Sequence, residues 1–376
     1  MISSAYIHIP FCQHICHYCD FNKVYLKGQP VNEYLSFLDL EMQLTLQKFP
    51  SDIVKTIFVG GGTPTALSAV QLDVLCQSIR RHLPFDQGEF TFEANPGELT
   101  EDKLLVLQKH GVNRLSFGVQ SFNNDLLKKI GRTHTVEEVY SSISTAKAIG
   151  FENISIDLIY SLPTQTLSDF EETINMALEL DLPHYSSYSL IVEPKTVFYN
   201  LMQKGRLSLP SQDKEAEMYE LLMEKMHKHG LHQYEISNFA KAGYESKHNL
   251  VYWNNEEYYG FGAGSHGYMN GIRRSNYGPL KKYMDPLKER TLPFIEENIV
   301  TKQEKMEEEM FLGLRKIEGV SKQKFEHKYG LDVKEVFPSS INKLVSQGLL
   351  KEQDDFLKLT KQGKLLGNEV FQSFLQ

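Results

Sequence analysis

The chain has 376 residues, enough for two domains or for one large domain with an appended unit. Hydrophobic residues make up 41% and charged residues 23%, an ordinary balance for a soluble globular protein. Forty basic residues against 48 acidic ones give a net charge of −8, which argues against nucleic acid as the main partner. No apolar run approaches the roughly 20 residues of a membrane span, and the N-terminus lacks a signal-peptide pattern. We expect a cytoplasmic protein, with peripheral membrane contact left open.

Residues 1–235 alternate short apolar runs with longer amphipathic ones. Strands are expected at Ala5–Ile9, Lys55–Val59, Glu89–Glu93, Arg114–Val119, Asn153–Leu158 and Tyr185–Val192. Helices are expected at Val31–Lys48, Ala69–His82, Thr100–His110, Val136–Ile149, Leu167–Leu180 and Gln212–His229. Connections of this length imply parallel strands joined by right-handed crossovers. The expected fold is α/β, a partial (β/α)6 barrel with its functional groups at the carboxyl ends of the strands.

Residues 236–297 are rich in Tyr, Asn, Gly and His and show little periodicity, so we treat them as a connector. Residues 298–376 form the expected C-terminal domain. Its helices are expected at Glu304–Arg315, Lys322–Tyr329 and Asp332–Gln347, followed by a β-hairpin, Leu349–Glu352 with Phe356–Leu359, and a last helix. Three helices and a hairpin are similar to a winged helix, an α+β unit. Because its acidic and basic residues are mixed, a packing or partner role is favoured over DNA binding.

Three of the four cysteines, Cys12, Cys16 and Cys19, fall within eight residues, and Cys76 lies far away in a helix-like apolar run. Three thiolates do not complete a tetrahedral zinc site or a four-cysteine cluster site by themselves. They can hold a [4Fe–4S] cluster by three of its irons, leaving the fourth open to a ligand from outside the protein. A zinc site that includes an interleaved histidine and a buried cysteine stripe on a helix remain alternatives.

Glycines and polar residues lie at or near the expected strand ends. They are Gly61, Gly62 and Thr63 after the second strand, Glu93 ending the third, Gln120 ending the fourth, Arg132 in the following loop and Asp157 in the fifth. Glycines let the backbone approach a ligand closely, and arginine can pair with a carboxylate as a fork. A carboxylate in an apolar strand is costly unless it is paired. Singly, each residue has a structural explanation, but together they predict one ligand site at the barrel rim.

The spacing C-x3-C-x2-C after a short strand, with Tyr18 before the last cysteine, resembles the signature of the radical S-adenosylmethionine (SAM) superfamily. The run from Tyr6 to Cys12 is similar, more narrowly, to the oxygen-independent coproporphyrinogen III oxidase group. The resemblance implies a [4Fe–4S] cluster, SAM chelated to its open iron, a reductant for the cluster, and cleavage of SAM to methionine and a 5′-deoxyadenosyl radical. The SAM contacts that it implies are Tyr6, Tyr18, Gly61, Gly62, Thr63, Glu93, Gln120, Arg132, Asp157 and Ile191.

The oxidase pattern places a fourth cysteine two residues after the third, where this chain has Phe21. Further on, His248-Asn249-Leu-Val-Tyr252-Trp253 resembles the haem-binding motif of the haem-chaperone branch of the group. A neutral imidazole is a natural axial ligand of haem iron, and aromatic rings can pack on the macrocycle. The alternative is an aromatic segment that caps the barrel, with its histidine simply hydrogen-bonded.

The resemblance therefore implies a haem chaperone that binds haem at His248, Asn249, Tyr252 and Trp253 and hands it to an acceptor hemoprotein. His266, at the end of a glycine-rich loop after this motif, is a spare candidate for the iron ligand. The cluster and SAM would act as a switch for dimerisation or haem transfer. The formation of a homodimer and the cleavage of SAM are left open. Two alternatives remain: oxidative decarboxylation of coproporphyrinogen III, and another radical SAM activity such as methyl transfer.

Overall fold

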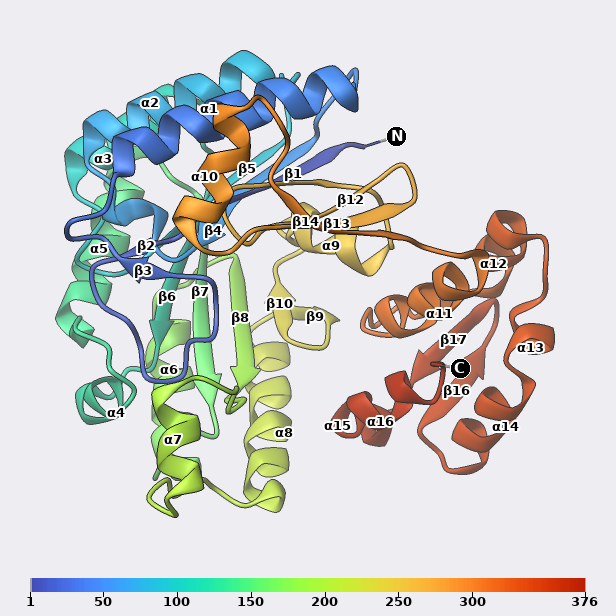
Figure 1. Ribbon diagram of the computed structural model, residues 1–376. Coiled ribbons are helices and arrows are strands. Elements are labelled where there is room, and N and C mark those ends of the chain that lie inside the picture. The colour runs from blue at the N-terminus through green and yellow to red at the C-terminus, as the bar shows by residue number, and fades with distance from the viewer. Residues whose placement is uncertain (1, 376) are drawn as a thin grey trace.

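The computed structural model describes residues 2–375, and its core is a curved sheet backed by helices (Figure 1). Within these residues the sheet has nine strands in the order β11-β1-β4-β5-β6-β7-β8-β10-β9. The strands are β1 Ser4–Ile9, β4 Thr56–Gly61, β5 Glu89–Ala94, β6 Arg114–Gln120, β7 Asn153–Tyr160, β8 His184–Ser189, β9 His232–Glu235, β10 Asn238–Ala240 and β11 Tyr259–Phe261. From β11 to β8 neighbours pair in parallel, whereas β10 pairs antiparallel with both β8 and β9. Because β11 and β9 do not pair with each other, the barrel is open, and the expectation of a partial barrel is confirmed.

Helices connect the parallel strands and pack against the sheet. They are α1 Val31–Lys48, α2 Ala69–His82, α3 Glu101–Lys109, α4 Asn124–Lys129, α5 Val136–Ile149, α6 Leu167–Glu179, α7 Val197–Gln203 and α8 Gln212–Lys228. Capping boxes begin several of them: Ser68 caps α2, Thr135 caps α5 and Thr166 caps α6, each in a reciprocal bond with the residue three positions on. Gly150 ends α5 at a φ of 107°, a left-handed conformation that glycine adopts without strain. Local chemistry thus fixes where these helices begin and end.

The region predicted as a connector contributes ordered structure to the barrel. It contains α9 Lys247–Trp253, α10 Leu280–Lys288 and the three-stranded sheet of β12 His266–Met269, β13 Ile272–Asn276 and β14 Phe294–Ile299. Strand β11 extends the main sheet by pairing with β1, with Ala5 opposite Tyr259. Three residues are too few for an alternating pattern to reveal a strand, so the sequence gives no sign of β11.

A buried glutamate holds this region against α1. The Glu41 carboxylate accepts hydrogen bonds from Gly262 N at 2.8 Å, Asn276 Nδ2 at 2.5 Å and the Tyr283 hydroxyl at 2.6 Å. Burial raises the pKa of Glu41 to about 7, although the three donors act in the opposite direction. The glutamate therefore connects α1, the loop after β11, β13 and α10 through one side chain.

The Glu41 carboxyl should make the stability of the protein fall as pH rises between about 4.5 and about 7. In this window the unfolded chain releases the proton while the folded chain keeps it, so the folded state binds more protons and a rise in pH favours unfolding. We expect the unfolding free energy of wild type, measured relative to Glu41→Gln, to fall by up to about 3 kcal/mol across the window. Urea unfolding at several pH values measures it, with Glu33→Gln on the exposed face of α1 as the control. A pH-independent difference between wild type and Glu41→Gln would contradict the assignment.

The C-terminal unit has its own hydrophobic core, which includes Met310, Phe325 and Leu357. Its helices are α11 Lys302–Gly313, α12 Lys322–Tyr329, α13 Val333–Val336, α14 Pro338–Ser346, α15 Lys361–Leu365 and α16 Gly367–Gln372, and its sheet orders β15 Val320–Ser321, β17 Phe356–Leu359 and β16 Leu350–Gln353. The prediction of a single helix at Asp332–Gln347 is wrong. The segment forms two helices, α13 and α14, because the ring of Pro338 disfavours a helical conformation at Phe337.

Two small strands, β2 Phe11–Cys12 and β3 Val24–Tyr25, pair in parallel and enclose the cysteine loop. Among residues 2–375, no helix has both the length and the apolar character needed to cross a membrane.

Candidate functional site

The carboxyl ends of the parallel strands surround a cavity of about 390 Å³. Its lining includes Cys12, Cys16, Cys19, Tyr18, Gly61, Gly62, Thr63, Glu93, Gln120, Arg132, Asp157 and Ile191. These are the residues that the sequence predicted for the cluster and SAM, except Tyr6. The Tyr6 hydroxyl instead lies 2.9 Å from Nδ1 of His8, and its ring stacks on Phe58.

Cys12, the last residue of β2, and Cys16 and Cys19, in the loop that follows it, line this cavity. Backbone and ring nitrogens of His17 lie 2.9 Å from the carbonyls of Ile130 and Lys129, which anchors the loop at the end of α4. Cys12 is buried, whereas Cys16 and Cys19 are half-buried. Within residues 2–375 no three His, Cys, Asp or Glu side chains converge on a position for a single ion.

A chain of hydrogen bonds connects the cysteine loop to the barrel strands. Arg132 donates Nε and Nη2 to the Tyr18 hydroxyl at 3.2 and 3.0 Å, and Nη1 to Oδ1 of Asn95 at 2.5 Å. Asn95 donates Nδ2 to Oγ1 of Thr63 at 3.1 Å, and the Thr63 hydroxyl points to Sγ of Cys12 at 3.7 Å. Sequence reasoning missed Asn95. The signal was its place two residues after the strand-end carboxylate, on the same face of the extended chain.

Removing the Tyr18 hydroxyl should destabilise this arrangement, because two N–H groups of Arg132 would lose their acceptor. We expect Tyr18→Phe to lower the unfolding free energy by about 1–3 kcal/mol in urea unfolding. The matched control is Tyr25→Phe in β3, whose side chain is 57% exposed and should change stability little. Equal stability of the two variants would show that the Tyr18 bonds contribute nothing.

Two half-buried carboxyl groups face the cavity from neighbouring parts of the sheet. Glu93 Oε2 accepts from the backbone N–H of Gly61 at 3.0 Å, and Asp157 Oδ1 accepts from the Ser116 hydroxyl at 3.4 Å. Burial and the nearby Asp157 charge raise the pKa of Glu93 to about 8. Burial also raises the pKa of Asp157. A cationic ligand group in the cavity would favour the ionised form of both carboxyls, so the site fits a ligand with an amino or sulfonium group.

Close packing and unusual backbone geometry mark two of the strand ends at the cavity. Gly61 has a φ of 112°, and a Cβ there would lie 2.4 Å from the His8 ring. A Cβ on Gly62 would lie 2.8 Å from the carbonyl carbon of Pro10. Gln120 ends β6 at a φ of 68°, where the register with β7 shifts. A non-glycine residue in this conformation carries local strain, which is common beside ligand sites.

The predicted haem motif lies on α9, which packs at the amino ends of the strands, opposite to the carboxyl ends that surround the cysteine cavity. His248 Nδ1 lies 2.9 Å from Oγ1 of Thr56, the first residue of β4, and Nε2 lies 2.8 Å from the Tyr252 hydroxyl. The imidazole stacks on Phe58 with ring centroids 5.3 Å apart. Burial and the nearby Arg114 charge lower the pKa of His248 to about 3, so the ring is neutral. Both ring nitrogens are therefore engaged within the fold.

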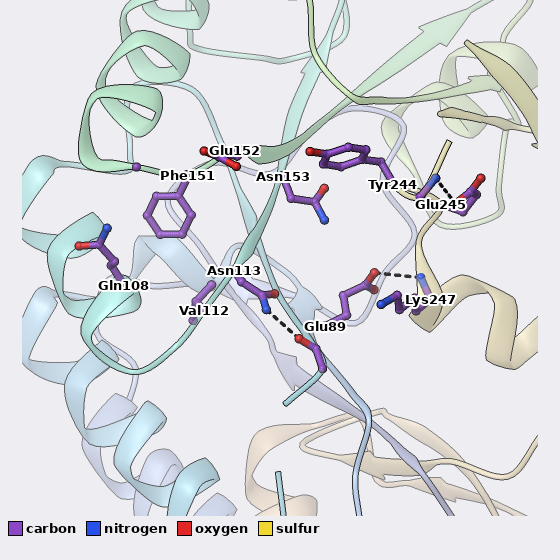
Figure 2. A pocket seen from close by; sticks show the side chains of 13 residues that line it. Glu89, Gln108, Val112, Asn113, Phe151, Glu152, Asn153, Tyr244, Glu245 and Lys247 are labelled. Carbon is purple, nitrogen blue, oxygen red and sulfur yellow. Dashed lines mark hydrogen bonds between the residues drawn. The ribbon is translucent and has the colours of Figure 1, made fainter. Parts of the chain in front are cut away.

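Glu89, the first residue of β5, holds the amino end of α9. Its carboxylate accepts from Lys247 N at 2.9 Å, His248 N at 3.0 Å and the Ser246 hydroxyl at 3.3 Å. Figure 2 shows the glutamate facing the backbone nitrogen of Lys247 beside a pocket of about 370 Å³. Because this pocket lies at the amino ends of the strands, it is separate from the cysteine cavity.

The carboxyl end of α9 contacts the C-terminal unit. The Arg315 guanidinium lies 4.4 Å from the centre of the Trp253 ring, and Lys316 Nζ donates to Oδ1 of Asn254 at 2.7 Å. Asn249 is half-buried and donates its backbone N–H to the hydroxyl of Ser246. The motif is thus enclosed between the barrel and the C-terminal unit.

An open parallel barrel with three cysteines at its carboxyl rim is the architecture of the radical SAM proteins. The family model described as the radical SAM superfamily matches residues 6–177, and the model described as the HemN C-terminal domain matches residues 300–366. In fold the chain resembles the coproporphyrinogen III oxidase HemN from Escherichia coli, with a TM-score of 0.87 and 24% identity over 99% of this chain and 90% of that one.

Similar sequences cover the chain almost end to end. The heme chaperone HemW of Bacillus subtilis is 59% identical over 100% of this chain and 99% of its own length. The HemW proteins of Lactococcus lactis and Escherichia coli are 49% and 34% identical, each over 99% of this chain and over 97% and 98% of their own lengths. The chain therefore belongs to the HemW family within the radical SAM superfamily. Membership of that superfamily implies a [4Fe–4S] cluster and SAM.

Proposed function

We propose that this protein is a haem chaperone, which binds haem and transfers it to an acceptor hemoprotein. The observation that carries the proposal is 59% identity, over the full length of both chains, to a protein named heme chaperone HemW. Phe21, at the position of the fourth cysteine of the oxidase pattern, supports a chaperone over an oxidase. The four cysteines are free, which fits the reducing cytoplasm where we place the protein.

The rim cavity fits the two cofactors. Cys12, Cys16 and Cys19 would hold the [4Fe–4S] cluster, and the neighbouring strand ends would hold SAM. With an external reductant, the bound cluster would supply one-electron reducing chemistry to SAM. The Arg132 fork suits the carboxylate of SAM, and Glu93 suits its amino group. The remaining proposed contacts are Tyr18, Gly61, Gly62, Thr63, Gln120, Asp157 and Ile191, which line the cavity, and Tyr6, which does not.

Haem, the cargo, would bind at the motif on α9. His248 is the proposed iron ligand, and Asn249, Tyr252 and Trp253 would line the macrocycle. Because both nitrogens of His248 are engaged with Thr56 and Tyr252, ligation requires α9 to move away from β4. The acceptor hemoprotein, the reductant and a homodimer belong to the same proposal.

Haem titration of the reconstituted protein tests the function. We expect a stoichiometric Soret band in wild type, a changed spectrum in His248→Ala, and transfer of haem to an apo-hemoprotein. Coproporphyrinogen turnover should be assayed anaerobically on the same sample. Protoporphyrinogen formation without stable haem binding would sink the chaperone proposal in favour of the oxidase.

A further inference from the structure

A second histidine near the motif differs from His248 in being open to solvent. His266 begins β12 with an exposed side chain, and its ring nitrogens make no hydrogen bond or ion pair among residues 2–375. An imidazole with a free nitrogen can ligate iron without any rearrangement of the fold, whereas His248 cannot.

His266 lies in a pocket of about 290 Å³ on the sheet of β12, β13 and β14. The three strands bring His266 opposite Ser275, and Ser275 opposite Glu296. Tyr258 forms another part of the wall. The pocket is therefore supported by a hydrogen-bonded sheet rather than by a loose loop.

Two arginines of β13 belong to the pocket lining, but only one has donors to spare. Arg273 donates Nε to Glu308 at 2.6 Å and Nη2 to Asn255 at 3.2 Å, and it lies over the Tyr268 ring at 4.4 Å. A guanidinium has five N–H donors, so these bonds leave others of Arg273 for a ligand. Arg274 is buried, and its Nε and Nη1 are held by Glu297 and by backbone carbonyls, so it supports the sheet instead. A planar ligand with a carboxylate at one edge suits the combination of imidazole, aromatic wall and the Arg273 guanidinium.

The pocket wall also touches the proposed haem motif. The rings of Tyr258 and Tyr252 are 4.7 Å apart at an interplanar angle of 82°, an edge-to-face contact. The Tyr258 backbone exchanges hydrogen bonds with Tyr268 at 2.8 and 2.9 Å. A ligand in the pocket would thus lie beside the tyrosine whose hydroxyl bonds to His248.

We propose that His266 is a capture ligand: it binds the iron of incoming haem at this pocket, with a haem propionate near Arg273, before α9 opens. This inference rests on the proposed haem-chaperone function. It assigns an open first site beside the closed motif, and it explains how haem can associate while both nitrogens of His248 are engaged.

The test is stopped-flow binding of ferric haem to wild type, His266→Ala and His227→Ala, followed in the Soret region. His227, exposed on α8, is the matched control. We expect His266→Ala to slow the first phase at least tenfold, added imidazole to restore the early spectrum, and His227→Ala to behave as wild type. Circular dichroism confirms folding of each variant.

Two contrary results are distinguishable. If wild type binds haem and His266→Ala follows the same time course and spectra, the capture site is overturned while the chaperone function stands. If wild type binds no haem, the chaperone function fails and the capture site fails with it.

Discussion

Cys16→Ala is expected to abolish the iron–sulfur absorbance of the anaerobically reconstituted protein. With two of the three thiolates left, a second iron of the cluster loses its protein ligand, and the cluster is exposed to loss and oxidation. Cys16 is half-buried in a loop that other residues anchor, so the fold should survive the change. Iron and sulfide content per chain and the visible spectrum measure the outcome.

The chain offers a matched control for this experiment. Cys76 undergoes the same chemical change in Cys76→Ala, but it is fully buried in α2 and does not line the cavity. We expect Cys76→Ala to keep the full iron content at a modest cost in stability. Full iron and sulfide in Cys16→Ala would contradict the three-cysteine assignment.

Much of the barrel could be predicted because its elements carry strong local signals. The predicted limits of three helices, which begin at Val31, Ala69 and Val136, agree with α1, α2 and α5. Apolar periodicity marks all three, and capping boxes mark the starts of α2 and α5. All six predicted parallel strands are present. The helices α4, α7 and α9 were missed because six or seven residues give too few turns for periodicity to show.

The features of the candidate site also divide into those that the sequence could predict and those that it could not. Residues at strand ends, such as Glu93 and Gln120, were predictable because parallel strands bring their carboxyl ends to one edge. The bonds of Arg132 to Tyr18 and Asn95 join segments more than 30 residues apart, and no local pattern encodes such a distance. A hydrogen-bonded His248 was one of the two alternatives that the sequence offered, but its partner Thr56 could not be predicted, because it lies on β4, far away in the sequence.

Glu89→Gln is the other substitution for which we expect a large effect. The carboxylate has 5% exposure and accepts three hydrogen bonds at the amino end of α9. Glutamine removes the charge that interacts favourably with this helix end and leaves one acceptor oxygen in place of two. A buried donor without an acceptor is costly, so we expect the unfolding free energy to fall by about 2–3 kcal/mol.

Amide hydrogen exchange shows which part of the chain loses stability in Glu89→Gln. In Glu89→Gln the backbone amides of residues 247–253 should exchange faster, because α9 opens more often, while those of the distant α5 should exchange as in wild type. Glu304→Gln provides the control, since Glu304 accepts from Thr301 at the exposed amino end of α11. That change should cost less, because water can satisfy the donors it leaves.

The same variant tests whether opening of α9 limits haem transfer to the motif. If His248 must leave Thr56 and Tyr252 before it can ligate iron, a more frequently open α9 should speed the slow phase of haem binding in Glu89→Gln. The first phase, assigned to His266, should keep its rate because His266 lies outside α9. Faster exchange in α9 with an unchanged slow phase would show that opening of α9 does not control ligation by His248.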